Sequence, residues 1–230
     1  GDRGDYDEWS EFALGWNLET LRPYLDRGRK QIGARYLTQE EVPEWAHVIH
    51  RAAVEAGLPA LDDFNDLTIP EGVGYLPCNV GDHRRWSTAF AYLDPARERA
   101  GLTVIGDALV DRVVVTGERA TGAVVVTAEG ETERSARAVI LGAGAFGSPG
   151  ILLRSGIGPA DELRRLGIEV AAELPGVGRN LLDHSGVNIV FGAAPELDAE
   201  LRAKEAGGRM FGNANMVRAA SSACGEGPLG

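Results

Sequence analysis

Residues 137–184 read RAVILGAGAFGSPGILLRSGIGPADELRRLGIEVAAELPGVGRNLLDH, and the predictions below are built outward from this stretch. Its first apolar run, Ala138 to Leu141, includes β-branched residues and predicts a short buried strand. Only glycine and alanine follow at 142–145, which lets another backbone or a ligand come close. Ser148 and Pro149 are typical of a helix start. A strand, a turn of small residues and a helix N-terminus, in this order, favour a nucleotide- or phosphate-binding site.

Gly142, Gly144 and Gly147 also match the G-x-G-x-x-G spacing of dinucleotide-binding folds. In those folds the helix runs unbroken to the next strand, and an acidic residue follows about 20 positions on. Here the segment 155–159 interrupts the helix, and Glu173 lies too far along the chain. An NAD(P)-binding oxidoreductase that uses these three glycines is therefore an alternative function. Simple packing of a helix on a strand is another explanation for the glycines.

Around these glycines the longer pattern resembles the second signature of the glucose–methanol–choline (GMC) flavoprotein oxidoreductases. The resemblance extends towards the N-terminus through DYDEW at 5–9, GVGY at 72–75 and RWSTAFAYL at 85–93. In the signature itself the matching residues are Gly144-Ala145, Ser148-Pro149, Ile151-Leu152, SGIGP at 155–159, Leu163, LGI at 166–168, LPGVG at 174–178, Asn180-Leu181 and Asp183-His184.

The fold class we expect is α/β, in part α+β. The residues predict strands at 109–116, 123–127 and 132–137, separated by turns at Gly117 and Gly130, which makes a β-meander. The resemblance implies a fragment of a glutathione-reductase-type FAD-binding fold. Its predicted parts are a helical and loop segment that borders the cofactor and the substrate domain (1–80), part of the FAD-binding domain (81–185) and the incomplete beginning of a substrate-binding domain (186–230).

Further elements are predicted from local pattern. A helix is expected at 38–57, where Thr38 and Glu41 have capping-box spacing, and the charged residues 196–206 are expected to be helical or mobile. Short strands are expected at 102–105, 168–172 and 186–191, with a further one beginning within 210–219. Asn17 is expected to cap the helix that follows it.

The resemblance implies FAD as cofactor and hydride transfer to the flavin from the CH–OH group of a small-molecule alcohol, choline-like in type. The electron acceptor is not specified. In the family, backbone groups of the residue that matches Val110 bind the adenine ring, although by residue type alone Val110 is a plain core valine. The remaining cofactor-binding candidates are Ala143, Gly144, Ala145, Asn180, Asp183 and His184.

We expect His184 to be a structural hydrogen-bonding residue rather than a base. The catalytic residues are unknown and are expected downstream of Gly230, because the family places its catalytic histidine near the C-terminus. The family's N-terminal G-x-G-x-x-G is not in this sequence either. The chain is therefore interpreted as an internal piece that binds FAD poorly alone and has no turnover, and a non-catalytic remnant domain is a third possibility.

Composition narrows the function classes. The net charge of −11 argues against a nucleic-acid partner or an anionic membrane surface. No apolar run approaches the roughly 18 residues that span a bilayer, and the acidic N-terminus is no signal peptide, so a cytoplasmic location is expected. Cys78 and Cys224 predict free thiols. No metal is expected, because His47 and His50 have no third ligand at a convincing spacing.

Overall fold

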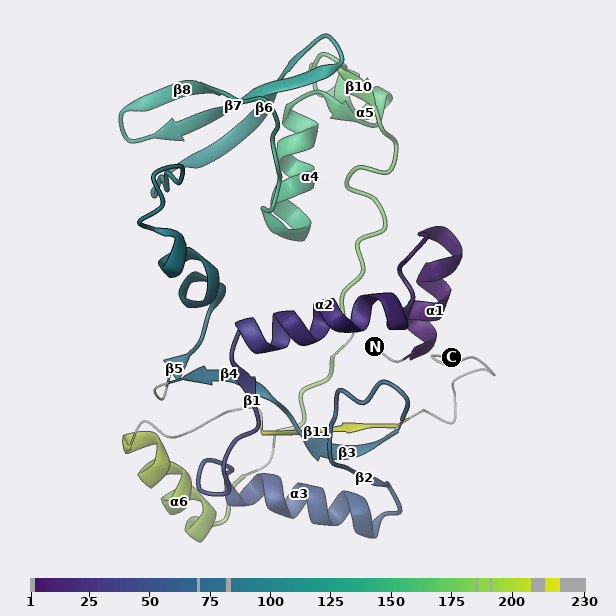
Figure 1. Cartoon of the computed structure of the whole chain (residues 1–230), viewed down its shortest axis with the longest axis vertical. Helices are drawn as coiled ribbons and strands as arrows, with labels where there is room; N and C mark the ends of the chain where they lie inside the picture. Colours follow the sequence, from purple (N-terminus) through teal and green to yellow (C-terminus); the bar gives the residue numbers. More distant parts are fainter. Residues whose placement is uncertain are drawn as a thin grey trace. The chain divides into compact units, whose positions relative to one another are not determined.

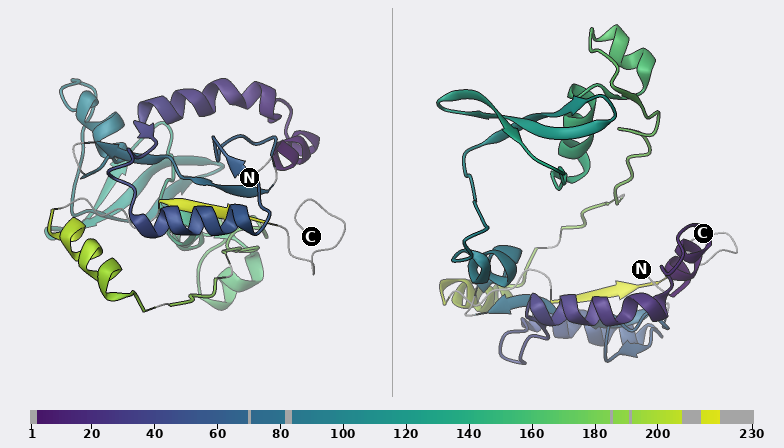
Figure 2. Two further views of the ribbon diagram at one scale, coloured as in Figure 1. Left: turned by 90° about the horizontal axis from the view of Figure 1, so that it is seen from below. Right: turned by 45° about the horizontal axis from the view of Figure 1, so that its top comes forward.

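The computed structural model describes residues 3–69, 71–81, 84–184, 186–190, 192–207 and 214–219. The chain divides into two compact units, which are drawn in Figures 1 and 2. The first unit comprises residues 1–102 and 190–230, and the second comprises residues 103–189. The assignment of 1–80, 81–185 and 186–230 to cofactor and substrate domains stays a prediction.

Three antiparallel strands form the sheet of the second unit: β6 (Leu109–Thr116), β7 (Arg119–Thr127) and β8 (Gly130–Ser135). They pair in the order β6-β7-β8, so the predicted β-meander is confirmed. Val113 and Val124 are buried in this sheet. β6 is an edge strand, and helix α4 lies alongside it (Figure 1).

The remainder of the second unit begins with α4 (Gly144–Arg154). It continues with β9 (Ile157–Gly158), α5 (Ala160–Arg165) and β10 (Ala172–Glu173). β9 and β10 pair in parallel. At the turn between α4 and β9, Gly156 has φ +76°, and its carbonyl accepts from the N–H groups of Ala171 and Ala172, at 2.8 and 3.1 Å. These hydrogen bonds hold the turn at Gly156 next to the start of β10.

The predicted strand at 138–141 is wrong. These residues join no ladder among the described residues, and the side chain of Ile140 is 94% exposed. A strand needs a neighbour for its backbone N–H and C=O groups, and no described segment lies beside this one. The helix also begins earlier than Ser148, at Gly144. Ser148 has a different role from the expected cap: its Oγ accepts from the N–H of Ala143 at 3.0 Å.

Other short strands are also predicted wrongly. Residues 102–105 and 186–190 have no ladder, and of 168–172 only Ala172 belongs to a strand. The predicted strand within 210–219 is found as β11 (Asn215–Arg218), and residues 210–213 lie outside the described part, as does Cys224. Apolar composition alone cannot tell a paired strand from an extended connection.

The first unit contains helices α1 (Arg3–Phe12), α2 (Leu18–Gln31), α3 (Glu44–Glu55) and α6 (Pro195–Ala206). The predicted cap of α2 is confirmed, because the side chain of Asn17 accepts from the N–H of Thr20 at 2.9 Å. The predicted helix at 196–206 is confirmed by α6. No helix in the described ranges combines the length and the apolar character that crossing a bilayer requires.

Two small sheets complete the first unit. One has the order β11-β3-β2, with β2 (Ala60–Leu61) parallel and β11 antiparallel to β3 (Gly72–Tyr75). A Cβ at Gly74 would come within 2.9 Å of the Leu61 carbonyl oxygen, which explains one glycine of the GVGY pattern. The other sheet has the order β1-β4-β5, formed by Ala34–Arg35, Cys78–Gly81 and Arg84–Arg85. After it come a π-helical turn (Ala89–Leu93) and a 3-10 turn (Asp94–Ala96).

The helix expected at 38–57 begins later than predicted, at Glu44, with Pro43 as its N-cap. Only half of the capping box forms: a carboxylate oxygen of Glu41 accepts from the N–H of Thr38 at 2.9 Å. The same carboxylate takes two bonds from Arg35, at 2.7 and 2.8 Å. The Arg35 guanidinium and the Thr38 N–H together lower the pKa of Glu41 to about 2.

We predict that Gly156→Ala lowers the free energy of unfolding of the second unit by about 2–5 kcal/mol, because positive φ and overpacking both penalise a Cβ. The added methyl would overlap the carbonyl oxygen of Glu169. Gly167→Ala is the control, since Gly167 has φ +72° but open space around it. It should cost only about 1–2 kcal/mol in urea denaturation followed by far-UV circular dichroism. Equal losses in the two variants would contradict the packing role of Gly156.

A second prediction concerns Glu41→Gln, which should lower the free energy of unfolding at pH 7 by about 1–2 kcal/mol. The pKa of Glu41 is depressed in the folded state, so its contribution is complete above the ordinary value of 4.5 and fades as the pH falls towards 2. The difference between variant and parent should therefore shrink between about pH 5 and pH 2. The control is Glu40→Gln at the exposed neighbouring residue, which should change the free energy of unfolding little at any pH. If the destabilisation caused by Glu41→Gln did not depend on pH, the ionic contribution of Glu41 would be ruled out.

Candidate functional site

The candidate site is a cavity in the second unit, between the start of β6 and one side of α4. Its volume is about 470 Å³, within the range of small-molecule pockets. It brings together Val110 and Ala143, two candidates that lie 33 positions apart in the sequence. The lining residues are Ala108, Leu109, Val110, Ile140, Leu141, Gly142, Ala143, Phe146, Gly147, Gly150, Ile151 and Arg154.

Small residues keep this cavity open. A Cβ built at Gly142 meets no atom within 4 Å, so the space beside the turn is unfilled by protein. Gly147 differs, because a Cβ there would come within 2.9 Å of the Ala143 side chain. The two large side chains of the lining, Ile140 and Phe146, are 94% and 80% exposed. They are therefore not buried within the cavity that they line.

The N-terminus of α4 borders the same space. Gly144 opens the helix with φ +79°, a conformation that glycine adopts without strain. The first N–H groups of a helix have no partner within it and carry partial positive charge. α4 has 11 residues, and no acidic residue lies in its first turn. An anionic group next to Ala143 would therefore meet a favourable field.

The other end of α4 is joined to β6. The Nε of Arg154 donates to the carbonyl oxygen of Asp111 at 2.8 Å, and it lies 2.9 Å from the Asp111 carboxylate. The Oγ of Ser155 accepts from the N–H of Val113 at 2.7 Å and donates to the carbonyl of Ile151 at 2.6 Å. Sequence reasoning missed Arg154 and Asp111. It quoted Ser155 within SGIGP, without its bond to β6.

The remaining candidates lie elsewhere in the second unit. Ala145 and Asn180 line a second hollow, on the side of α4 next to the loop 176–182. Asn180 has φ +55°, a left-handed conformation that asparagine tolerates better than most residues. Asp183 and His184 are exposed and line neither hollow. A carboxylate oxygen of Asp183 accepts from the backbone N–H of His184 at 2.8 Å. Gly144 lies between Ala143, which lines the first cavity, and Ala145, which lines the second hollow, but Gly144 itself lines neither.

The G-x-G-x-x-G match at 142–147 does not open a complete mononucleotide-binding unit. No described strand pairs with the residues just before α4, and the strand after it, β9, has only two residues. Gly142 and Gly147 contribute to the cavity, whereas Gly144 serves the helix start. The alternative of a self-contained NAD(P) site is therefore the weaker explanation of these glycines.

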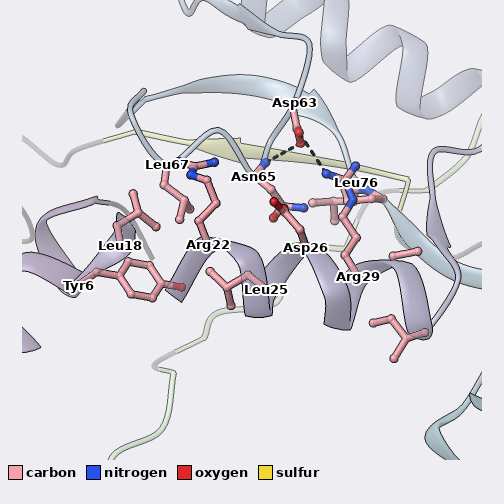
Figure 3. Close-up of a pocket in the computed structure, with 13 residues that line it drawn as sticks. Tyr6, Leu18, Arg22, Leu25, Asp26, Arg29, Asp63, Asn65, Leu67 and Leu76 are labelled. Carbon is pink, nitrogen blue, oxygen red and sulfur yellow. Dashed lines mark hydrogen bonds and ion pairs between the residues drawn. The ribbon is translucent and has the colours of Figure 1, made fainter. Parts of the chain in front are cut away.

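Figure 3 shows a different cavity, in the first unit, between α2 and the loop 63–67; its volume is also about 470 Å³. The Arg29 guanidinium points at the Asp63 carboxylate and bonds it at 3.2 Å. Burial and the hydrogen bond to Asp63 raise the pKa of the Tyr36 hydroxyl, whose oxygen lies 2.5 Å from that carboxylate, to about 12. Arg29 and Asp63 are therefore partnered with each other, and Arg22 and Asp26 are the other charged residues that line this cavity.

The two histidines of α3 belong to a small aromatic cluster. The Nδ1 of His47 lies 2.6 Å from the hydroxyl of Tyr75, and the ring of His50 stacks on the Tyr75 ring with centroids 5.1 Å apart. Within the described ranges, no group of three or more histidine, cysteine, aspartate or glutamate residues has the geometry to hold a metal ion.

Comparison with known proteins gives the family. The sequence model of the family described as GMC oxidoreductase matches residues 1–186. Human mitochondrial choline dehydrogenase is 37% identical over 203 residues, which cover 82% of this chain and 34% of the relative. The oxygen-dependent choline dehydrogenase of Pectobacterium atrosepticum is 38% identical over 200 residues, covering 80% of this chain and 36% of the relative. The chain thus spans about a third of the length of these relatives.

A solved structure is similar as well. The FAD-dependent oxidoreductase from Chaetomium thermophilum aligns with a TM-score of 0.70 and 25% identity. The alignment covers 94% of this chain and 45% of that protein. Similarity in sequence to the family model and its members, and similarity in structure to a flavin enzyme, lead to the same assignment. The chain belongs to the GMC oxidoreductase family.

Proposed function

We propose that this chain is part of an FAD-dependent oxidoreductase that acts on the CH–OH group of a small alcohol. Family membership supports the reaction class, and two relatives named as choline dehydrogenases make a choline-like alcohol the first candidate substrate. The single observation that carries the cofactor proposal is the cavity that Val110 and Ala143 share. When bound, FAD would accept a hydride at the flavin.

In this proposal, the cavity holds the adenosine half of FAD. Val110 would present backbone groups to the adenine ring, and Ala143 would form the opposite wall, where its small side chain leaves room for the ring. The N-terminus of α4 would face the pyrophosphate. Asn180, Asp183 and His184 are proposed to lie beside the cofactor without touching the adenine, because they do not line this cavity.

We propose further that the second unit belongs to a glutathione-reductase-type FAD-binding domain, in which the β6-β7-β8 meander is a characteristic part. The first unit would contribute to the substrate-binding domain. No catalytic residue is assigned within 1–230. The choline-like substrate and the cytoplasmic location stay predictions, and no electron acceptor is assigned.

Ligand titration of the 230-residue chain tests the cofactor proposal. ADP, which carries the adenosine and pyrophosphate of FAD, should bind weakly and shift the backbone amide resonances of Val110 and Gly142 in NMR spectra. FMN, which lacks adenine, should leave these resonances unchanged. Selective binding of NADH over both ADP and FAD would favour the NAD(P) alternative instead. A protein of the relatives' length that contains this chain and stays colourless after FAD addition would indicate a non-catalytic remnant.

A cavity-filling variant tests the location. We predict that Ala143→Leu weakens ADP binding at least about tenfold, which corresponds to about 1.4 kcal/mol, because the larger side chain occupies the ring's space. Ala145→Leu is the matched control: it lies two residues on and lines the other hollow. It should leave the ADP affinity within about twofold. A larger loss in Ala145→Leu than in Ala143→Leu would move the adenosine site to the hollow next to Asn180.

A further inference from the structure

The junction between β6 and the end of α4 borders the cavity that Val110 and Ala143 line. β6 is the edge strand of its sheet among the described residues, so one row of its backbone N–H and C=O groups pairs with no described strand. α4 lies alongside β6 (Figure 1). Two of those backbone groups bind side chains from the end of α4: the Asp111 carbonyl binds Arg154, and the Val113 N–H binds Ser155.

A β-bulge lies at this junction. The register of β6 against β7 shifts between Val110, which faces Val125, and Arg112, which faces Val124. Asp111 is therefore the extra residue of the bulge. A bulge bends its strand, frees backbone groups from the ladder and often re-aims a neighbouring residue near a binding site. The carbonyl of Asp111 is such a freed group, and the neighbour that the bulge re-aims is Val110.

Arg154 holds the bulge from two directions. Its Nε contacts both the carbonyl oxygen and the carboxylate of Asp111, at 2.8 and 2.9 Å. A Cβ built at Gly150, one turn earlier, would approach the Arg154 guanidinium to 3.4 Å, so the absence of a side chain at Gly150 gives the guanidinium space to lie along the helix. Arg112 also pairs with the Asp111 carboxylate, at 2.7 Å, but it does not line the cavity.

We propose that Arg154 is a positioning residue for the adenosine site: by clamping the bulged residue Asp111 to the end of α4, it fixes the distance between Val110 and Ala143. This inference rests on the proposed function. Arg154 lines the same cavity as both residues, so loss of the clamp frees Val110 from its place opposite the small-residue turn. The charge of Arg154 is paired with Asp111, and its role is to set the shape of the cavity rather than to bind phosphate.

The experiment compares Arg154→Met with Arg112→Met in the 230-residue chain. Both variants remove one guanidinium from the same carboxylate, but only Arg154→Met breaks a contact between β6 and α4, where the bond between Ser155 and Val113 remains. Arg112→Met also breaks the pair of Arg112 with Glu131. ADP and adenosine are titrated in parallel by NMR. Arg154→Met should weaken the binding of both ligands by the same factor, about tenfold, and should shift the Val110 amide resonance even without ligand. Arg112→Met should leave both affinities within about twofold.

Several outcomes are decisive. If Arg154→Met and Arg112→Met weaken ligand binding equally, the proposed role of Arg154 as a clamp is wrong. If Arg154→Met weakens the binding of ADP but not of adenosine, Arg154 is a phosphate contact instead. If the parent chain binds neither ligand, the proposed adenosine site is wrong. The clamp is then judged by the ligand-free spectra alone: a shifted Val110 amide resonance in Arg154→Met supports it, and an unchanged resonance contradicts it. If Arg154→Met does not fold, Arg154→Lys, which keeps the charge but not the paired contacts, should show a smaller loss, about threefold, for both ligands.

Discussion

The outer edge of β6 imposes the constraint on which the second unit depends. An edge strand leaves backbone donors and acceptors that must find partners, and two of these partners come from consecutive residues at the end of α4, Arg154 and Ser155. The helix cannot slide along the sheet without breaking these bonds. Because the helix begins at the small-residue turn and ends at this junction, the same bonds set the position of Ala143 relative to Val110. In this account, the cavity results from the hydrogen bonds that Arg154 and Ser155 make to the unpaired backbone groups of β6.

Sequence reasoning found the elements whose signals are local. The meander follows from alternating apolar residues broken by turns at Gly117 and Gly130, and the cap at Asn17 needs only its own helix. The strand at 138–141 failed for a physical reason: apolar, β-branched residues favour extended backbone, but a ladder needs a partner, and none lies alongside in the described chain. Helix starts were misplaced near prolines, at Pro43 and Pro149, where a helix can begin either just after or several residues before the ring.

The candidate site shows the same division. Val110 was nominated through family resemblance, since a valine on a strand carries no chemical signal of its own, and the structure places it in one cavity with Ala143. The cofactor roles of both residues stay predictions. Arg154 could not have been found from the sequence, because its partner Asp111 lies 43 positions away and the bulge that exposes the carbonyl depends on the register of two strands. Asn180 had no sequence signal for its left-handed backbone beyond its residue type.

A crystal structure of this chain soaked with ADP tests the central claim most directly. The account predicts electron density for an adenine ring between Val110 and Ala143, with the pyrophosphate directed towards the first turn of α4. Density for the nucleotide against the loop 176–182, with the cavity between β6 and α4 filled only by solvent, would contradict it.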